Sequence, residues 1–178
     1  MSIFDLTAIQ TSLLKNLGGK RNPSSLPRLN KVVLNYRLGD SRDSQEAVNQ
    51  AESEIKAISG QKPKLCRAKK AVSGFKLRPN EPLAFKVTLR GRRMYNFIAN
   101  LFNLVLPRLR DFKGMPLNAF DSQGNYNLTL KDQTYFPEID LNKITKIRSL
   151  QVTLNLSSAS QAESKMLLSA LGFPFEKN

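Results

Sequence analysis

Residues 83–90 alternate between apolar and polar side chains, and this alternation restricts the possible folds of the chain more than any other segment does. The apolar positions are Leu83, Phe85, Val87 and Leu89, and the polar positions are Lys86, Thr88 and Arg90. Because successive side chains of a strand point to opposite faces of a sheet, the pattern predicts a strand with one buried and one open face. The open face is polar and basic, so it is a candidate platform for RNA.

The spacing of apolar residues elsewhere predicts four helices and four more strands. The helices are expected at 3–17, 44–59, 92–106 and 160–171, and the strands at 29–36, 64–69, 125–130 and 150–156. Ser44 and Gly60 are expected to bound the second helix, and Pro107 to end the third. The order α-β-α-β-β-α-β-β-α predicts an α+β fold: a mostly antiparallel sheet with helices packed on one face and a polar, basic, RNA-facing side.

The length and composition suit one compact domain. A chain of 178 residues with 40% hydrophobic residues can bury a core of useful size. We expect a single domain over residues 1–178, with a short helix and connector at 1–25 and a projecting basic loop at 71–80. Residues 1–16 resemble neither a secretory signal nor an organelle transit peptide.

Missing residue types exclude several classes of function. The chain has no histidine, which excludes Cys/His zinc sites, Ser/His/Asp triads and histidine bases. A single cysteine, Cys66, excludes an internal disulfide and a thiolate cluster. Glu138 and Asp140 read as a solvated loop rather than as a catalytic pair. No apolar run approaches the roughly 20 residues needed to span a bilayer. We therefore expect no catalytic residue, metal, cofactor or membrane partner.

The charge is concentrated in one interval. The net charge is +14, and no acidic residue lies between Glu54 and Glu81. The interval holds eight basic residues: Lys56, Lys62, Lys64, Arg67, Lys69, Lys70, Lys76 and Arg78. A solvated surface is the alternative, but a long run of one sign is typical of contact with a polyanion, most often a phosphate backbone. Phe75 could stack on a base or ribose, or pack back onto the sheet.

Two further basic clusters lie elsewhere in the chain. The first is formed by Arg90, Arg92 and Arg93 at a strand-to-helix junction, where a helix N-terminus favours phosphate. The second is formed by Arg108, Arg110 and Lys113 after that helix. Exposed charge at a helix start is the alternative for the first cluster. Three clusters on separate elements indicate a broad basic surface rather than one groove.

Several strings, in this order and spacing, resemble the bacterial-type ribosomal proteins of the L-five family, which bind 5S rRNA. They are Ile58–Pro63, Ala68–Arg78, Lys86–Gly91, Pro107–Gly114, Gly124–Asn127, Phe136–Asp140 and Leu171–Phe175. The resemblance covers about residues 26–175. It implies an α+β domain in the central protuberance of the large subunit, with no catalysis of its own. The implied partners are 5S rRNA, large-subunit rRNA, peptidyl-site tRNA, neighbouring large-subunit proteins and a small-subunit head protein across an intersubunit bridge.

The resemblance also implies site residues. The positions that match the family's 5S rRNA contacts are Lys31, Asn35, Gln61 and Thr88; the basic runs add Lys62, Arg90 and Arg92. Lysine and arginine suit phosphate, whereas amides and hydroxyls suit base edges and 2′-hydroxyls. The loop 71–80 matches the family's tRNA-contacting loop, and its expected contacts are Ser73, Gly74, Phe75, Lys76 and Arg78.

The sequence departs from the family in two places. Residues 1–25 are short and dissimilar, and Tyr36–Gly39 replaces a string of smaller residues, so this edge of the sheet is expected to repack. This divergence favours a mitochondrial ribosome, with the bacterial cytoplasm as the alternative. A free-standing RNA chaperone or translation regulator would be the alternative function. An RNA-cleaving enzyme is disfavoured because histidine and a metal-type carboxylate cluster are missing.

Overall fold

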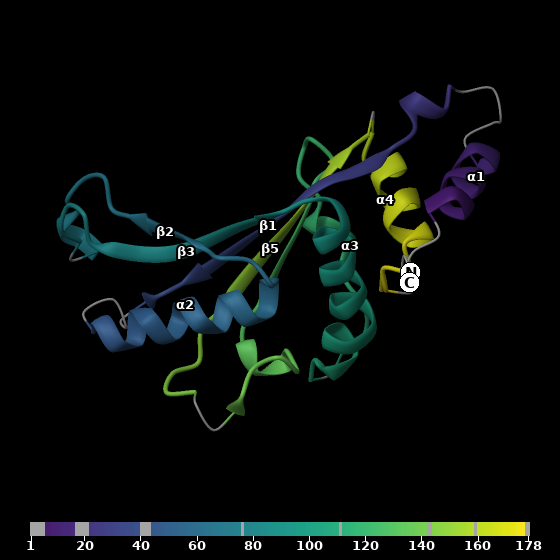
Figure 1. Ribbon diagram of the computed structural model, residues 1–178. Helices are drawn as coiled ribbons and strands as arrows, with labels where there is room; N and C mark the ends of the chain where they lie inside the picture. The colour runs from purple at the N-terminus through teal and green to yellow at the C-terminus, as the bar shows by residue number, and fades with distance from the viewer. Residues whose placement is uncertain are drawn as a thin grey trace. The chain divides into compact units, whose positions relative to one another are not determined.

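The computed structural model describes residues 6–16, 22–39, 44–75, 77–110, 112–141, 144–158 and 160–176. The elements along the chain are α1 (Leu6–Asn16), β1 (Arg28–Arg37), α2 (Gln45–Ser59), β2 (Lys64–Arg67), β3 (Pro82–Leu89), α3 (Gly91–Asn100), β4 (Tyr126–Leu130), β5 (Leu150–Ser157) and α4 (Gln161–Ala170) (Figure 1). This is the predicted order of elements. Residues 3–5 and 17 of the first expected helix lie outside the described residues.

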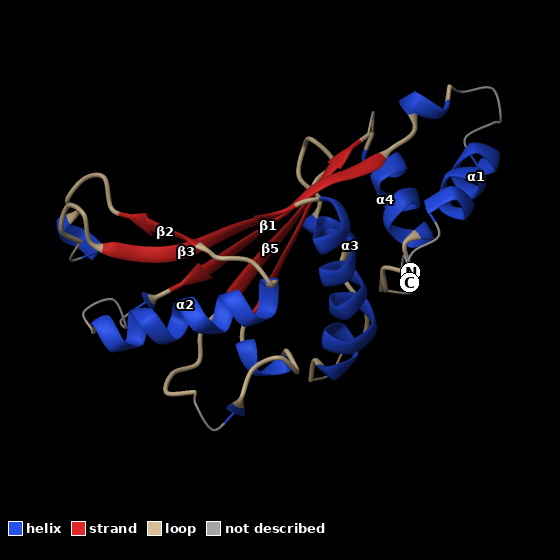
Figure 2. Cartoon of the chain, in the orientation of Figure 1, coloured by secondary structure: helices blue, strands red, loops and turns tan. Residues whose placement is uncertain are grey.

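The strands form one open antiparallel sheet in the order β2-β3-β1-β5-β4 (Figure 2). In the β2–β3 pair, Lys64 lies opposite Lys86, and a β-bulge interrupts the register between Cys66 and Arg67. With four α-helices in the described part of the chain, the predicted α+β class is confirmed. No helix among the described residues is long and apolar enough to cross a membrane.

Backbone contacts divide the chain into two compact units. The first consists of Met1–Val32, Arg90–Leu128 and Thr153–Asn178, and the second of Val33–Leu89 and Thr129–Val152. The expectation of a single domain over 1–178 stays a prediction.

In the second unit, α2 packs against β3. Its caps are the predicted ones, since the Ser44 side chain accepts from the amide of Ala47 at 3.4 Å. Gly60 closes the helix at φ 63°, where its amide donates to the carbonyl of Lys56 at 2.9 Å. Ala51, Ile55 and Ile58 are buried, as the predicted apolar stripe of Ala47, Ala51, Ile55 and Ile58 requires, whereas Ala47 is only half-buried and Val48 is buried in addition.

In the first unit, the helix that starts at Gly91 does not stay α-helical to residue 106. It changes to a π-helix at Leu101–Val105 and then to a 3-10 turn at Leu106–Arg108. Pro107 has no amide proton and its ring would clash within a regular helix, so the winding changes before it. Proline thus alters the winding here, while the helical path continues one residue beyond it.

The core of the first unit includes an aromatic cluster. Its members are Phe102, Phe120, Tyr126, Phe173 and Phe175, with ring centroids 4.8–6.1 Å apart for the closest pairs. The C-terminal segment reaches this cluster by lying along residue 115, whose amide donates to the carbonyl of Pro174 at 2.8 Å. The approach is close, because a Cβ on Gly114 would lie 2.5 Å from the Cα of Glu176.

Candidate RNA-binding surface

The polar side of β3 lies where the alternation predicted it. Lys86 is exposed and Thr88 is half-buried, whereas Phe85, Val87 and Leu89 are buried. The predicted strand with one buried and one polar, basic face is therefore confirmed. Lys62, which precedes β2, is also exposed, so it adds a positive charge near this edge of the sheet.

Gln61 and Thr88 are brought together in the second unit, although 27 residues separate them. The Nε2 of Gln61 donates to the carbonyl oxygen of Thr88 at 3.5 Å. Ser59 fixes this turn: its Oγ accepts from the amide of Gln61 at 3.3 Å and donates to the carbonyl of Ile55 at 2.7 Å. The last described pair of the β2–β3 ladder on this side is Lys64 with Lys86. The Gln61 amide therefore satisfies a strand carbonyl beyond the end of that ladder.

Asn35 contributes an amide from β1. Its side chain is half-buried, and its Nδ2 donates to the Oε1 of Gln151 on β5 at 3.4 Å. Gln151 is exposed and alternates with buried Leu150 and Val152. The same alternation in residues 150–156 is a sequence signal that could have added Gln151 to the predicted site.

The first unit carries the other expected rRNA contacts. Lys31 is half-buried on β1, and Arg90 and Arg92 are exposed at the start of α3. Arg90 occupies the N-cap position without a side-chain capping bond, and Gly91 takes φ 57°. The first turn of α3 contains no acidic residue. The arginines therefore lie at a helix start, where the first amide groups have no acceptor within the helix, an arrangement that suits an anion.

The basic loop 71–80 connects β2 and β3 and extends from their ends (Figure 1). Val72 and Leu77 form an isolated bridge, with their two amide–carbonyl bonds at 3.1 and 3.2 Å. Between them, Ser73–Phe75 form a 3-10 turn without a buried residue. The Phe75 side chain is 73% exposed, which favours the outward alternative over packing onto the sheet. Lys76 lies outside the described residues.

The base of this loop is closely tied. The amide of Ala68 donates to the carbonyl of Glu81, and the amide of Asn80 donates back to Ala68, both at 2.9 Å. The Nη1 of Arg67 donates to the carbonyl of Asn80 at 2.9 Å. Asn80 takes φ 65°, a left-handed conformation that asparagine tolerates better than most residues.

The two carboxylates that bound the acid-free interval are both engaged. Glu81 accepts from the backbone amide of Arg78 at 2.7 Å. Glu54 is buried and lies 3.1 Å from the Nη1 of Arg148. Several cations between them are exposed: Lys62, Lys64, Arg67, Lys69, Lys70 and Arg78.

Sequence reasoning missed the buried network around Glu54. The Tyr36 hydroxyl donates to the Oε2 of Glu54, and Arg148 donates to both carboxylate oxygens. Burial, together with the hydrogen bond to Glu54, raises the pKa of the Tyr36 phenol well above its ordinary value. Glu54 lies three residues after buried Ala51, so an acid on the apolar side of the helix was the available signal. Tyr36 lies near the end of β1, which is the central strand rather than an edge of the sheet, and the network shows how this bulkier side chain is accommodated there.

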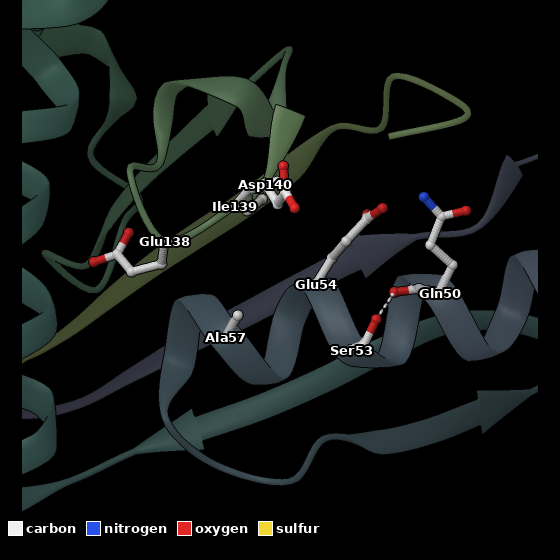
Figure 3. A pocket seen from close by; sticks show the side chains of 7 residues that line it. All are labelled: Gln50, Ser53, Glu54, Ala57, Glu138, Ile139 and Asp140. Carbon is white, nitrogen blue, oxygen red and sulfur yellow. Dashed lines mark hydrogen bonds between the residues drawn. The ribbon is translucent and has the colours of Figure 1, made fainter. Parts of the chain in front are cut away.

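Glu138 and Asp140 line a pocket beside α2 (Figure 3). Glu54, Gln50 and Ser53 also line it, and the Ser53 hydroxyl donates to the carbonyl of Gln50 at 2.7 Å. The Glu138 carboxylate points away from that of Glu54, which Arg148 neutralises, so the three acids do not converge on one point. The described residues contain no group of three or more Cys, Asp or Glu side chains that could hold a metal ion.

Two family models match the chain. The model described as "Ribosomal protein L5" matches residues 22–78, and the model of the C-terminus of the same ribosomal protein family matches residues 82–175. These two segments contain the expected site residues in both units.

Curated relatives match most of the chain. "Large ribosomal subunit protein uL5" of Caldanaerobacter subterraneus is 45% identical over 159 residues, or 89% of both chains. The protein of that name from Dehalococcoides mccartyi is 48% identical over 88% of both chains. That from Oceanobacillus iheyensis is 43% identical over 94% of this chain and 96% of its own.

These relatives are bacterial, so the expected mitochondrial location has no support from them, and they fit the bacterial alternative. The string Tyr36–Gly39, which suggested an organelle, has a local explanation, because Tyr36 is buried against Glu54.

Proposed function

Because this chain belongs to the ribosomal protein L5 family, we propose that the polar side of its sheet binds 5S rRNA within the large ribosomal subunit. Membership makes the chain a structural constituent of that subunit, with rRNA and neighbouring ribosomal proteins as its partners, and not an enzyme. The identity of the RNA and of each neighbour belongs to the proposal, as does a location in the central protuberance of a bacterial ribosome.

The contact between Gln61 and Thr88 supports this proposal best. It places an amide and a hydroxyl-bearing residue beside each other at the edge of a polar sheet face. Amides and hydroxyls can exchange hydrogen bonds with base edges and 2′-hydroxyls, which phosphate-binding lysines cannot read. Lys62 and Lys86, both exposed, supply positive charge beside them. We assign Gln61 and Thr88 to recognition, and the lysines to phosphate contacts.

The test measures the affinity of this chain for 5S rRNA. Gln61→Ala and Thr88→Ala are each expected to weaken specific binding by about 1–3 kcal/mol. Thr129→Ala is the matched control, because Thr129 is exposed on β4, and β1 and β5 separate that strand from β3. If the Gln61/Thr88 double variant binds 5S rRNA as tightly as the unchanged chain, the proposed site is wrong.

Salt dependence separates the two kinds of contact. Each phosphate neutralised by a cation adds close to one unit to the slope of log affinity against log salt, about 0.9 on duplex nucleic acid. Lys31→Gln, Arg90→Gln and Arg92→Gln are each expected to reduce this slope. Gln61→Ala and Thr88→Ala should leave the slope unchanged while lowering the affinity. Equal slopes in all five variants would contradict the assignment of the cations to phosphate.

The loop 71–80 is proposed to contact peptidyl-site tRNA. Its support is the exposure of Ser73, Gly74, Phe75 and Arg78 on a loop that extends from the sheet. Replacing Lys76 and Arg78 by glutamate is expected to impair tRNA binding in the peptidyl site more than subunit assembly. Ribosomes that carry both substitutions and retain normal peptidyl-site occupancy would contradict this role. A bridge to a small-subunit head protein completes the proposal.

A further inference from the structure

A pocket of about 350 Å³ lies in the second unit, where the end of β1 meets the segment 146–149. Two exposed cations line it, Arg37 from β1 and Lys146 from the facing segment. No ion pair involves either side chain among the described residues. Arg148 and Ser149 form another part of the wall. Glu54 neutralises Arg148, so the two positive charges that remain at the pocket are those of Arg37 and Lys146.

One residue that lines the pocket, Arg148, has a hydrogen-bond donor without an acceptor. Arg148 is 4% exposed, and its two terminal nitrogens donate to Glu54 and to the carbonyl of Ala47. Its Nε is buried and has no hydrogen-bond partner in the described structure. A buried N–H of a charged group without an acceptor is unfavourable, so an acceptor at this place would be stabilised.

The wall is held in place by one buried amide. Gln133 is 0% exposed; its Nε2 donates to the carbonyl of Lys146 at 2.7 Å, and its Oε1 accepts from the amide of Arg148 at 2.6 Å. These two bonds fix the backbone on both sides of Ile147, which turns outward and is 69% exposed. A fixed backbone reduces the ordering that a ligand must impose when it binds.

The pocket lies at the end of the sheet from which the basic loop extends. The amide of Leu38 donates to the carbonyl of Leu83 at 3.0 Å, which ties the pocket's first wall to the start of β3. Residues 71–80 end two residues before that strand. The C-terminal end of the loop therefore lies near this wall of the pocket.

We propose that this pocket binds a phosphate group of RNA, held by Arg37, Lys146 and the Nε of Arg148. Phosphate oxygens accept charge-assisted bonds from guanidinium and ammonium groups, which are among the stronger hydrogen bonds in proteins. The choice of RNA over an acidic protein segment rests on the proposed function of the loop, together with the net charge of +14. The pocket extends the RNA footprint from the loop onto the end of β1.

The first experiment follows the Nε–Hε signal of Arg148 by NMR while inorganic phosphate is added to the full chain, with chloride at equal ionic strength as the control. Phosphate is expected to shift this signal to saturation, and chloride is not. Arg37→Gln with Lys146→Gln should weaken phosphate binding at least about tenfold. Lys131→Gln, an exposed lysine of the same unit outside the pocket, should leave it unchanged. An equal shift with chloride, or undiminished phosphate binding in the double variant, would overturn the proposal that this pocket binds phosphate.

The second experiment identifies the source of the phosphate. Transfer RNA should bind the Arg37/Lys146 double variant about tenfold more weakly, and the salt slope should fall by between one and two units. If hexaglutamate displaces phosphate at lower concentration than transfer RNA does, the pocket serves a carboxylate partner and the RNA assignment is wrong. Arg78→Glu should weaken transfer RNA binding without changing the phosphate titration. If the unchanged chain binds phosphate at Arg148 but no transfer RNA, the anion pocket stands and the function proposed for the loop fails.

Discussion

The guanidinium of Arg148 lies 3.1 Å from the carboxylate of Glu54, and both side chains are almost completely buried. Tyr36 donates a further hydrogen bond to this carboxylate, and Gln133 holds the backbone of Arg148. The pair joins α2 to the segment before β5 inside the second unit. Because each charge compensates the other away from water, the pair specifies how these two segments meet.

Glu54→Gln is expected to destabilise the fold by about 3–5 kcal/mol, because Arg148 would remain buried without its counter-charge. The measurement is urea unfolding at neutral pH. Glu52→Gln, on the same helix and only partly buried, is the control and should stay within about 0.5 kcal/mol of the unchanged chain. A coupling energy near zero in a Glu54/Arg148 double-mutant cycle would contradict the account.

Tyr126 should contribute to a fall in stability as the pH rises from about 10 to about 12, in addition to Tyr36, whose pKa is also raised. Burial raises the pKa of the Tyr126 phenol to about 12, from an ordinary value of 10.0. Between these values the unfolded chain loses the proton and the folded chain keeps it, so unfolding becomes more favourable as pH rises. The part of this loss that is due to Tyr126 is about 3 kcal/mol for two pKa units.

The measurement compares urea unfolding at pH 9 and pH 11 in the unchanged chain and in Tyr126→Phe. The variant also loses the bond from the Tyr126 hydroxyl to the carbonyl of Pro116 at 2.8 Å, which lowers stability at both pH values. The diagnostic quantity is therefore the change in unfolding free energy between pH 9 and pH 11, compared between the unchanged chain and the variant. An equal pH effect in both proteins would exclude Tyr126 as its source.

Gly114→Ala is expected to destabilise the chain by several kcal/mol. The residue takes φ 116°, and a Cβ there would lie 2.5 Å from the Cα of Glu176 and 2.8 Å from the carbonyl carbon of Phe175. Backbone atoms cannot move aside as a flexible side chain can, so strain adds to the loss of contact with the C-terminal segment.

Gly74→Ala is the matched control, because nothing lies within 4 Å of a Cβ placed there. Its thermal unfolding midpoint should remain close to that of the unchanged chain or rise slightly, since alanine restricts the unfolded state. Equal midpoints for the two variants would show that the C-terminal segment does not pack as described.

Asn125→Ala should cost about 2–4 kcal/mol, because it leaves several buried polar groups without partners. The Oδ1 of Asn125 accepts from the Asn155 side chain at 2.8 Å and from the amide of Leu156 at 3.2 Å. Its Nδ2 donates to Asp121 at 2.8 Å. Asn118→Ala, at an exposed position of the same unit, is the control for urea unfolding. Similar losses in the two variants would argue against the anchoring role of Asn125.

Local patterns were sufficient where neighbours in sequence decide the structure. The alternation of residues 83–90 predicted β3, and Ser44 and Gly60 predicted the ends of α2, because capping is a contact between residues a few positions apart. The π-helix at Leu101–Val105 was not predicted. A proline signals that a helix must change, but it does not specify which winding precedes it.

Long-range partners could not be read from the sequence. Tyr36 and Arg148 reach Glu54 across 18 and 94 residues, and no periodicity connects such distant positions. Gln61 and Thr88 were named through a resemblance, and only the fold shows that they are neighbours. The pocket near Arg37 could not be predicted either, because its two cations come from segments that are distant in sequence.

The bonds between Arg67, Ala68, Asn80 and Glu81 tie the two strands together at the base of the loop. In the proposed tRNA contact, ordering would be confined to the residues between Ala68 and Asn80, so the entropy lost on binding would be small and release would be fast. A loop of this kind suits a ligand that binds and dissociates repeatedly, because fast exchange requires contact without extensive refolding.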